Sequence, residues 1–235
     1  AYNMKKFIST LVLLSIFFSI LTINVFCLEG SNANNKIAYI TFDDGPNKNT
    51  SKILDILKEY NMKATFFLLE DRINAYPETV KRMLSEGHSI GLHGQSHEKT
   101  VFYANDYSAL NEMNNTKHTL KHLFGCNIKL IRVPYGSKPH LTKAQYNSLV
   151  NNGYRVWDWN IDSTDTHKGA NVTSIVSNTL KDLNNYSTPI ILFHDKQVTV
   201  ESLPYILSNL KENNFSCIPI DQDQLPMNWW NKAVY

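Results

Sequence analysis

Short apolar segments alternate with amphipathic stretches from residue 36 onward, and this alternation constrains the fold more than any other feature of the chain. Several of the apolar segments are nearly continuous, as parallel strands are when helices cover both faces of their sheet. Repeated alternation of strand and helix therefore predicts a parallel α/β sheet, either open or closed into a barrel. The predicted strands are residues 36–42, 63–69, 88–93, 128–133, 154–161, 189–194 and 215–220.

The stretches between these strands carry apolar residues at helical spacing. We expect Thr50 or Ser51 to cap the start of the first helix, and Gly87 and Gly125 occupy the position that glycine favours after a helix. Because no internal repeat or linker interrupts the pattern, we predict that residues 34–235 form a single domain. The predicted helices are residues 50–60, 79–87, 106–125, 142–153, 171–183 and 201–213.

Residues 1–33 have a different character. Lys5 and Lys6 precede an uncharged apolar run over residues 7–27, and Ala33 ends a group of small residues of the kind that signal peptidase reads. The run is also nearly long enough to span a bilayer. We therefore predict a signal peptide or an N-terminal membrane anchor in residues 1–33, and an exported protein that is secreted or held at the cell surface. Membrane contact is expected only through this segment, if it is not cleaved.

The charge balance and the cysteine content argue against two classes of protein, those that bind nucleic acid and those held together by disulfides. The formal net charge is +2 at pH 7 and no basic run follows the N-terminal segment, which argues against a nucleic-acid partner. Three cysteines are too few for a disulfide framework. Cys126 and Cys217 lie beside apolar runs, so we predict that both are buried free thiols. We expect the protein to be a monomer.

Acids, histidines and an arginine stand where five of the predicted strands end. In parallel α/β proteins, functional sites gather at the carboxyl ends of the strands. The consistent placement of these polar residues predicts that they share one rim of the sheet. They are Asp43 and Asp44, His93 with His97, Arg132, the segment 162–165, and His194 with Asp195.

These residue types suit metal-assisted hydrolysis. One carboxylate and two histidines can bind Zn²⁺ and leave a position open for water, as catalytic zinc sites require. A second carboxylate, left without a metal, can take a proton from that water. Arg132 would keep this base ionised and oriented. The pair Asp43 and Asp44 supplies the two carboxylates, and His93 with His97 supplies the imidazoles.

Five segments resemble, in order, the motifs of the polysaccharide deacetylases of carbohydrate esterase family 4, which have the NodB-homology fold. The resemblance covers residues 36 to about 221 and implies a distorted (β/α)7–8 barrel with parallel strands and outer helices. The segments are TFDDGP (41–46), HGQSH (93–97), RVPYG (132–136), DSTD (162–165) and LFHD (192–195).

The resemblance also implies a role for each matching residue. Asp43 is the implied general base, held by Arg132, and His194 is the implied general acid, paired with Asp165. The implied metal ligands are Asp44, His93 and His97. The implied substrate-binding residues are Pro134, Tyr135, Gly136 and Leu192, with the Tyr135 backbone N–H at the oxyanion and Leu192 at the acetyl pocket.

The activity implied is the removal of acetyl groups from N-acetylglucosamine units, assisted by one divalent metal ion. We favour Zn²⁺, with Co²⁺ and Ni²⁺ as alternatives for the same ligands. Export favours cell-wall peptidoglycan as the N-acetylated polysaccharide. The alternatives are a chitin or chitooligosaccharide deacetylase, an acetyl-xylan esterase, and a non-catalytic carbohydrate-binding relative. The last would be expected to lack the base or a ligand, and this sequence lacks neither.

Two positions depart from the family pattern. Val133 replaces a proline in the third motif, and Thr166 follows Asp165 where the family usually has tryptophan. Loss of that indole affects the expected shape of the acetyl pocket and leaves the metal ligands unchanged. Trp229 and Trp230 are predicted to pack over the bottom of the barrel, with stacking on a sugar as the alternative.

Overall fold

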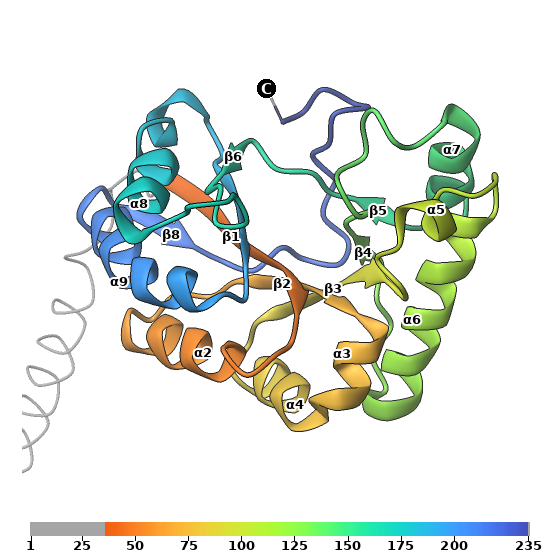
Figure 1. Cartoon of the computed structure of the whole chain (residues 1–235), viewed down its shortest axis with the longest axis horizontal. Helices are drawn as coiled ribbons and strands as arrows, with labels where there is room; N and C mark the ends of the chain where they lie inside the picture. Colours follow the sequence, from red (N-terminus) through yellow and green to blue (C-terminus); the bar gives the residue numbers. More distant parts are fainter. Residues whose placement is uncertain (1–35, 235) are drawn as a thin grey trace, which may run out of the picture. The chain divides into compact units, whose positions relative to one another are not determined.

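The computed structural model describes residues 36–234, and its central element is an eight-stranded sheet (Figure 1). Along the sheet the strands lie in the order β5-β4-β3-β2-β1-β7-β6, with β8 also paired to β1, and the pairings are parallel. The predicted parallel α/β class is therefore confirmed. The strands are β1 (Lys36–Gly45), β2 (Thr65–Leu69), β3 (Ser89–Gly94), β4 (Leu130–Ile131), β5 (Arg155–Val156), β6 (Ile161–Asp162), β7 (Ile190–His194) and β8 (Phe215–Cys217).

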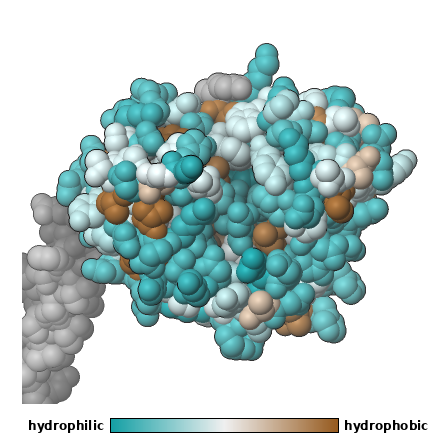
Figure 2. All heavy atoms as spheres, viewed as in Figure 1, coloured by the Kyte–Doolittle hydropathy of each residue, from teal (hydrophilic) through white to brown (hydrophobic). Residues whose placement is uncertain are grey.

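Helices cover the outside of this sheet. In Figure 1, α2 to α4 lie below it, α6 and α7 at the right, and α8 and α9 at the left. Their outward faces are polar, as the sequence pattern predicted, and hydrophilic residues cover most of the face seen in Figure 2. The helices are α2 (Thr50–Glu59), α3 (Glu70–Ala75), α4 (Pro77–Ser85), α5 (Lys99–Phe102), α6 (Ser108–Phe124), α7 (Lys143–Asn151), α8 (Val172–Leu180) and α9 (Gln197–Glu212), with a 3₁₀ turn at Leu183–Asn185.

The helix ends follow the sequence signals only in part. Gly125 ends α6 with φ 70°, the left-handed conformation that favours glycine after a helix. The predicted cap of α2 was wrong. Asn49 precedes the helix without a capping side chain, and the Thr50 hydroxyl accepts a hydrogen bond from the Asn47 N–H at 2.8 Å instead.

The sheet is a barrel that stays open between β5 and β6. Residues 154–161, predicted as one strand, form two short strands on opposite edges of the sheet, because the chain between them leaves the sheet. Trp157 turns into the core with no exposed surface, and the Asn160 side chain accepts from the Ile190 N–H and donates to the Thr188 carbonyl. The C-terminal segment meets this gap, where the Met227 carbonyl accepts from the Asp158 N–H.

The predicted N-terminal segment 1–33 lies outside the described residues. Within residues 36–234, no helix combines the length and the apolar character that crossing a membrane would require. Cys126 and Cys217 are free thiols as predicted, although Cys126 is half-buried and Cys217 alone of the two is fully buried.

Candidate functional site

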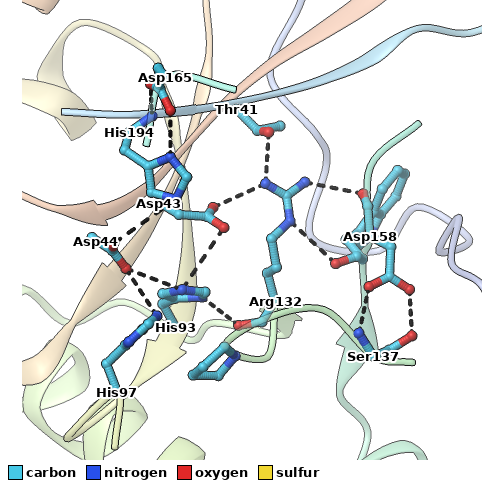
Figure 3. A network of polar contacts seen from close by, with 12 residues as sticks. Thr41, Asp43, Asp44, His93, His97, Arg132, Ser137, Asp158, Asp165 and His194 are labelled. Atoms are coloured by element: carbon cyan, nitrogen blue, oxygen red, sulfur yellow. Dashed lines mark hydrogen bonds and ion pairs between the residues drawn. The ribbon is translucent and has the colours of Figure 1, made fainter. Parts of the chain in front are cut away.

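Strand register brings the predicted site residues to one rim (Figure 3). β1 carries Asp43 and Asp44 near its carboxyl end, and Asp43 lies directly beside His194 on β7. His93 lies near the carboxyl end of β3, and Arg132 directly follows β4. The rim predicted from the strand ends is therefore present in the structure.

Asp44, His93 and His97 form a group of three metal-ligating side chains. Asp44 Oδ1 lies 3.3 Å from His93 Nε2 and 3.4 Å from His97 Nε2, and it is buried without a hydrogen-bond partner in residues 36–234. In a tetrahedral zinc site with ligands about 2.0–2.1 Å from the metal, neighbouring ligand atoms lie about 3.3–3.4 Å apart. The three side chains therefore fit a divalent cation.

Local conformation aims these donors at one another. Asp44 has φ 69° where the register of β1 shifts between Asp43 and Gly45, and His97 has φ 55° in the loop after β3, so neither residue follows a regular strand path. His93 Nδ1 lies 2.7 Å from the Arg132 carbonyl oxygen, which can only accept. Nδ1 therefore carries a proton, which leaves Nε2, the atom facing Asp44, as the one that can bind a metal.

The rings and carboxylates of this group shift one another's ionisation. Burial would raise the pKa of Asp44, but the interaction with His93 and the charges of His194 and His97 hold it well below its ordinary value. Burial works to lower the pKa of His93, and the charges of Asp43 and Asp44 raise it above the ordinary value. The pKa of His97 is lowered, by burial and by the neighbouring His93.

Asp43 is held by Arg132 and faces the same group. Arg132 has no exposed surface, and its Nη1 donates to Asp43 Oδ1 at 3.0 Å and to the Thr41 hydroxyl at 2.7 Å. Its Nη2 and Nε donate to the carbonyls of Asp158 and Trp157. With Oδ1 engaged, Asp43 Oδ2 points to the metal-ligating group, 3.9 Å from His93 Nε2.

His194 and Asp165 form a second charged pair beside the same group. His194 Nδ1 donates to Asp165 Oδ1 at 2.8 Å, and Asp165 Oδ2 accepts from the His194 N–H and from the Thr199 hydroxyl. Burial would lower the pKa of His194, but Asp165, with help from Asp43 and Asp44, raises it to about 9. Its Nε2 lies 4.0 Å from Asp44 Oδ2.

The predicted substrate-binding residues border this site. Tyr135 has φ 66° and a half-exposed side chain whose ring lies 4.8 Å from the ring of His97. No acceptor for its backbone N–H is found among the described residues. The Pro134 carbonyl accepts from the Tyr103 hydroxyl at 2.5 Å. Leu192 is 5% exposed on β7, beside Thr41 of β1.

Trp229 and Trp230 do not pack over the bottom of the barrel, and that prediction was wrong. Both lie at the carboxyl ends of the strands, beside the third motif. A Cβ on Gly136, which has φ 85°, would overlap the Trp229 ring, so the close approach of this ring requires glycine. Trp230 stacks on Tyr146 with ring centroids 4.8 Å apart.

Sequence reasoning missed Asp158, which ties this region together. Its buried carboxylate accepts from the Ser137 N–H and hydroxyl and from the Trp229 N–H, and burial raises its pKa. An acid inside the apolar run 154–161 was the signal that could have revealed it, since a buried carboxylate needs several donors. His118 and His122 stack on α6, but no metal-ligating group in residues 36–234 includes them.

The chain is similar to known proteins in both sequence and structure. A family model described as polysaccharide deacetylase matches residues 30–157. The Bacillus subtilis protein YheN is 39% identical over 200 residues, which are 83% of this chain and 71% of that protein. A peptidoglycan-N-acetylglucosamine deacetylase of Bacillus cereus is 37% identical over 205 residues, 83% of this chain and 74% of that protein. The crystal structure of the polysaccharide deacetylase Bc1974 from Bacillus cereus matches with a TM-score of 0.79 and 36% identity, covering 85% of this chain and all of that one.

Proposed function

The chain belongs to the polysaccharide deacetylase family, and from this premise we propose that it is a metal-dependent hydrolase that removes N-acetyl groups from N-acetylglucosamine units. We favour cell-wall peptidoglycan as the polysaccharide, which requires export of the protein. The Bacillus cereus relative named for peptidoglycan N-acetylglucosamine supports this choice.

One observation carries the proposal. Two charged pairs lie beside the metal-ligating group, Asp43 with Arg132 and His194 with Asp165 (Figure 3). One pair places a carboxylate oxygen beside the group, and the other places an imidazole Nε2 there. Hydrolysis of an amide needs a base for water and an acid for the departing nitrogen, so this arrangement supplies both.

The cation would be held by Asp44, His93 and His97, and we favour Zn²⁺ among the ions that suit two imidazoles and a carboxylate. When bound, it would polarise the acetyl carbonyl and increase the acidity of water. Asp43 would take the proton from the attacking water through Oδ2. Arg132 would keep Oδ1 engaged, so that the carboxylate stays ionised and oriented.

His194 would give its Nε2 proton to the departing amine. Because Asp165 and its neighbouring carboxylates raise the pKa of His194 above its ordinary value despite burial, the ring can hold a proton near neutral pH and act as the acid. The Tyr135 N–H, without an acceptor among the described residues, would donate to the oxygen that gains negative charge. One such donor is worth about 3 kcal/mol in amide hydrolysis. Leu192 would line the pocket for the acetyl methyl group.

Release of acetate from three polymers tests this proposal. Purified peptidoglycan, N-acetylglucosamine oligomers and acetylated xylan would be treated in parallel with the metal-loaded protein and with Asp43→Asn as the inactive control. We expect acetate from peptidoglycan, and none after chelation until metal is restored. Faster release from chitin oligomers or xylan would assign the alternative substrates. Sugar binding with no acetate from any polymer would identify a non-catalytic relative.

A further inference from the structure

Glu112, a residue of α6, holds the loop that joins His93 to His97. Its Oε2 accepts from the N–H groups of Gln95 and Ser96 at 2.9 and 3.1 Å, and its Oε1 accepts from the Ser96 hydroxyl at 2.6 Å. The side chain is buried, with 6% of the residue exposed. A carboxylate of the neighbouring helix thus fixes both residues at the centre of the loop.

The two histidines depend on this loop to different degrees. His93 lies within β3, and its Nδ1 is fixed by the Arg132 carbonyl. His97 lies beyond the strand with φ 55°, and its side chain is 27% exposed. Its position relative to Asp44 is therefore set by the backbone of residues 94–97. The loop, rather than the strand, determines whether His97 Nε2 reaches Asp44 and His93.

The contact between Glu112 and the loop is closely fitted. Gly94 has φ 107°, and a Cβ there would lie 3.1 Å from both Glu112 Oε2 and the Phe102 ring. Glycine therefore lets the carboxylate approach the loop backbone. All three donors to Glu112 are uncharged. A buried carboxylate is costly without donors for its oxygens, so α6 and the loop depend on each other for this conformation.

We propose that Glu112 is a positioning residue for the metal site, an inference that rests on the metal-dependent function proposed above. It holds the loop so that Nε2 of His97 already faces Asp44 and His93 before a cation arrives. A pre-ordered set of ligands binds more tightly, because less conformational freedom is lost on binding. The hydrogen bonds of the Glu112 side chain go to Gln95 and Ser96 and to none of the three metal-ligating side chains, so Glu112 acts through the loop.

Zinc affinity, measured by competition with a chromophoric chelator, tests this role. Glu112→Ala removes the acceptors, and we expect the Kd for Zn²⁺ to rise about 10- to 100-fold, the usual effect of losing a residue that supports a metal ligand. Glu112→Gln keeps an amide oxygen for the two N–H groups but loses the charge. Its Kd for Zn²⁺ should therefore lie between those of the wild type and Glu112→Ala. At saturating Co²⁺, the visible absorption of Glu112→Ala should also differ from that of the wild type.

Thr116→Val provides a matched control on the same helix. Thr116 is fully buried and donates within α6 to the Glu112 carbonyl, so its loss affects the helix without removing a contact to the loop. We expect wild-type metal affinity and cobalt absorption from it. An Ala variant at residue 112 that binds zinc as tightly as the wild type would overturn the inference.

Two other outcomes of the metal-binding measurements also decide between the proposals. If Glu112→Ala does not fold, Glu112→Gln and Ser96→Ala decide, and unchanged zinc affinity in both would refute the role. If the wild type itself binds no zinc, cobalt or nickel, the proposed metal-dependent function fails. Tight binding by the wild type with no effect of Glu112 would refute only the positioning role.

Discussion

The pair of Asp165 and His194 gives the most direct test of the catalytic assignment. In Asp165→Asn, the amide oxygen must face the two donors that Asp165 Oδ2 now accepts, the His194 N–H and the Thr199 hydroxyl. The substitution removes the negative charge beside His194, and the amide NH₂ then faces His194 Nδ1. A protonated ring carries a hydrogen on Nδ1, so two donors would meet, and the substitution disfavours the charged ring in two ways.

The structure sets the size of the effect. The surroundings raise the pKa of His194 from 6.5 to about 9, which corresponds to about 3 kcal/mol at about 1.36 kcal/mol per pKa unit. Asp165 is the nearest carboxylate, 2.8 Å from the ring against 4.0 Å for Asp44. Loss of such a partner changes a pKa by about 1–3 units. We expect the pKa of His194 to fall by about 2 units in Asp165→Asn.

The assay is the pH dependence of kcat/KM for acetate release, whose alkaline limb reports the loss of the protonated acid in the free enzyme. The limb should move to lower pH by about 2 units in Asp165→Asn. A bound cation lowers the pKa of His194 in both proteins, so the comparison is made at equal metal loading. Thr199→Val removes one donor but keeps the charge, and its limb should stay in place. An unmoved limb in Asp165→Asn would show that His194 does not depend on Asp165 for its proton.

The same pair affects stability in a defined pH window. Since the folded pKa of His194 lies above the unfolded value, the stabilisation is complete below about pH 6.5 and is lost as the pH rises through about 9. The free energy of unfolding of the metal-free protein should therefore differ most between wild type and Asp165→Asn below neutral pH. The difference should shrink in alkaline solution.

Three other substitutions probe the rest of the site. Asp43→Asn should reduce turnover by about 10² or more while the metal content per chain stays unchanged, and near-normal turnover would remove Asp43 as the base. Thr166→Trp should lower KM on a glycan oligomer more than it changes kcat, because Thr166 is expected to leave the groove more open and an added indole strengthens binding uniformly; an unchanged KM would show that Thr166 does not open the groove. Arg132→Met leaves Asp43 buried without its cation and should destabilise the metal-free protein by about 3–5 kcal/mol in urea unfolding, whereas a loss below about 1 kcal/mol would show that this pair is not buried in solution.

The sequence was sufficient to predict the parallel sheet and the rim because both depend on local patterns. A continuous apolar segment such as residues 36–42 is informative by itself, and Asp43 stands at its end whatever the rest of the chain does. The parallel register then places Asp43 beside His194, 151 positions further along the chain. The polar residues at the predicted strand ends are therefore sufficient to locate the rim.

The features that were missed depend on contacts between distant segments. Residues 154–161 have the composition of one strand, but Asp158 finds its donors at Ser137 and Trp229, and these contacts draw the chain out of the sheet. Glu112 lies in the second turn of α6, in a helix where a glutamate usually faces solvent. Nothing in its own neighbourhood indicates that it supports a loop near residue 95. Such residues are recognised only when the partner segment is in place.

The three aspartates at the site differ in how their charges are balanced. Asp43 has Arg132 at 3.0 Å, and Asp165 has His194 at 2.8 Å. Asp44 shares its Oδ1 between two imidazoles and has no hydrogen bond on that atom within the described residues. Its low pKa in the metal-free protein relies on neighbouring rings, and the pKa of His93 is raised in return. A divalent cation supplies the charge that these rings otherwise provide by protonation, so metal binding and proton binding compete at this group. Metal affinity should accordingly weaken as the pH falls.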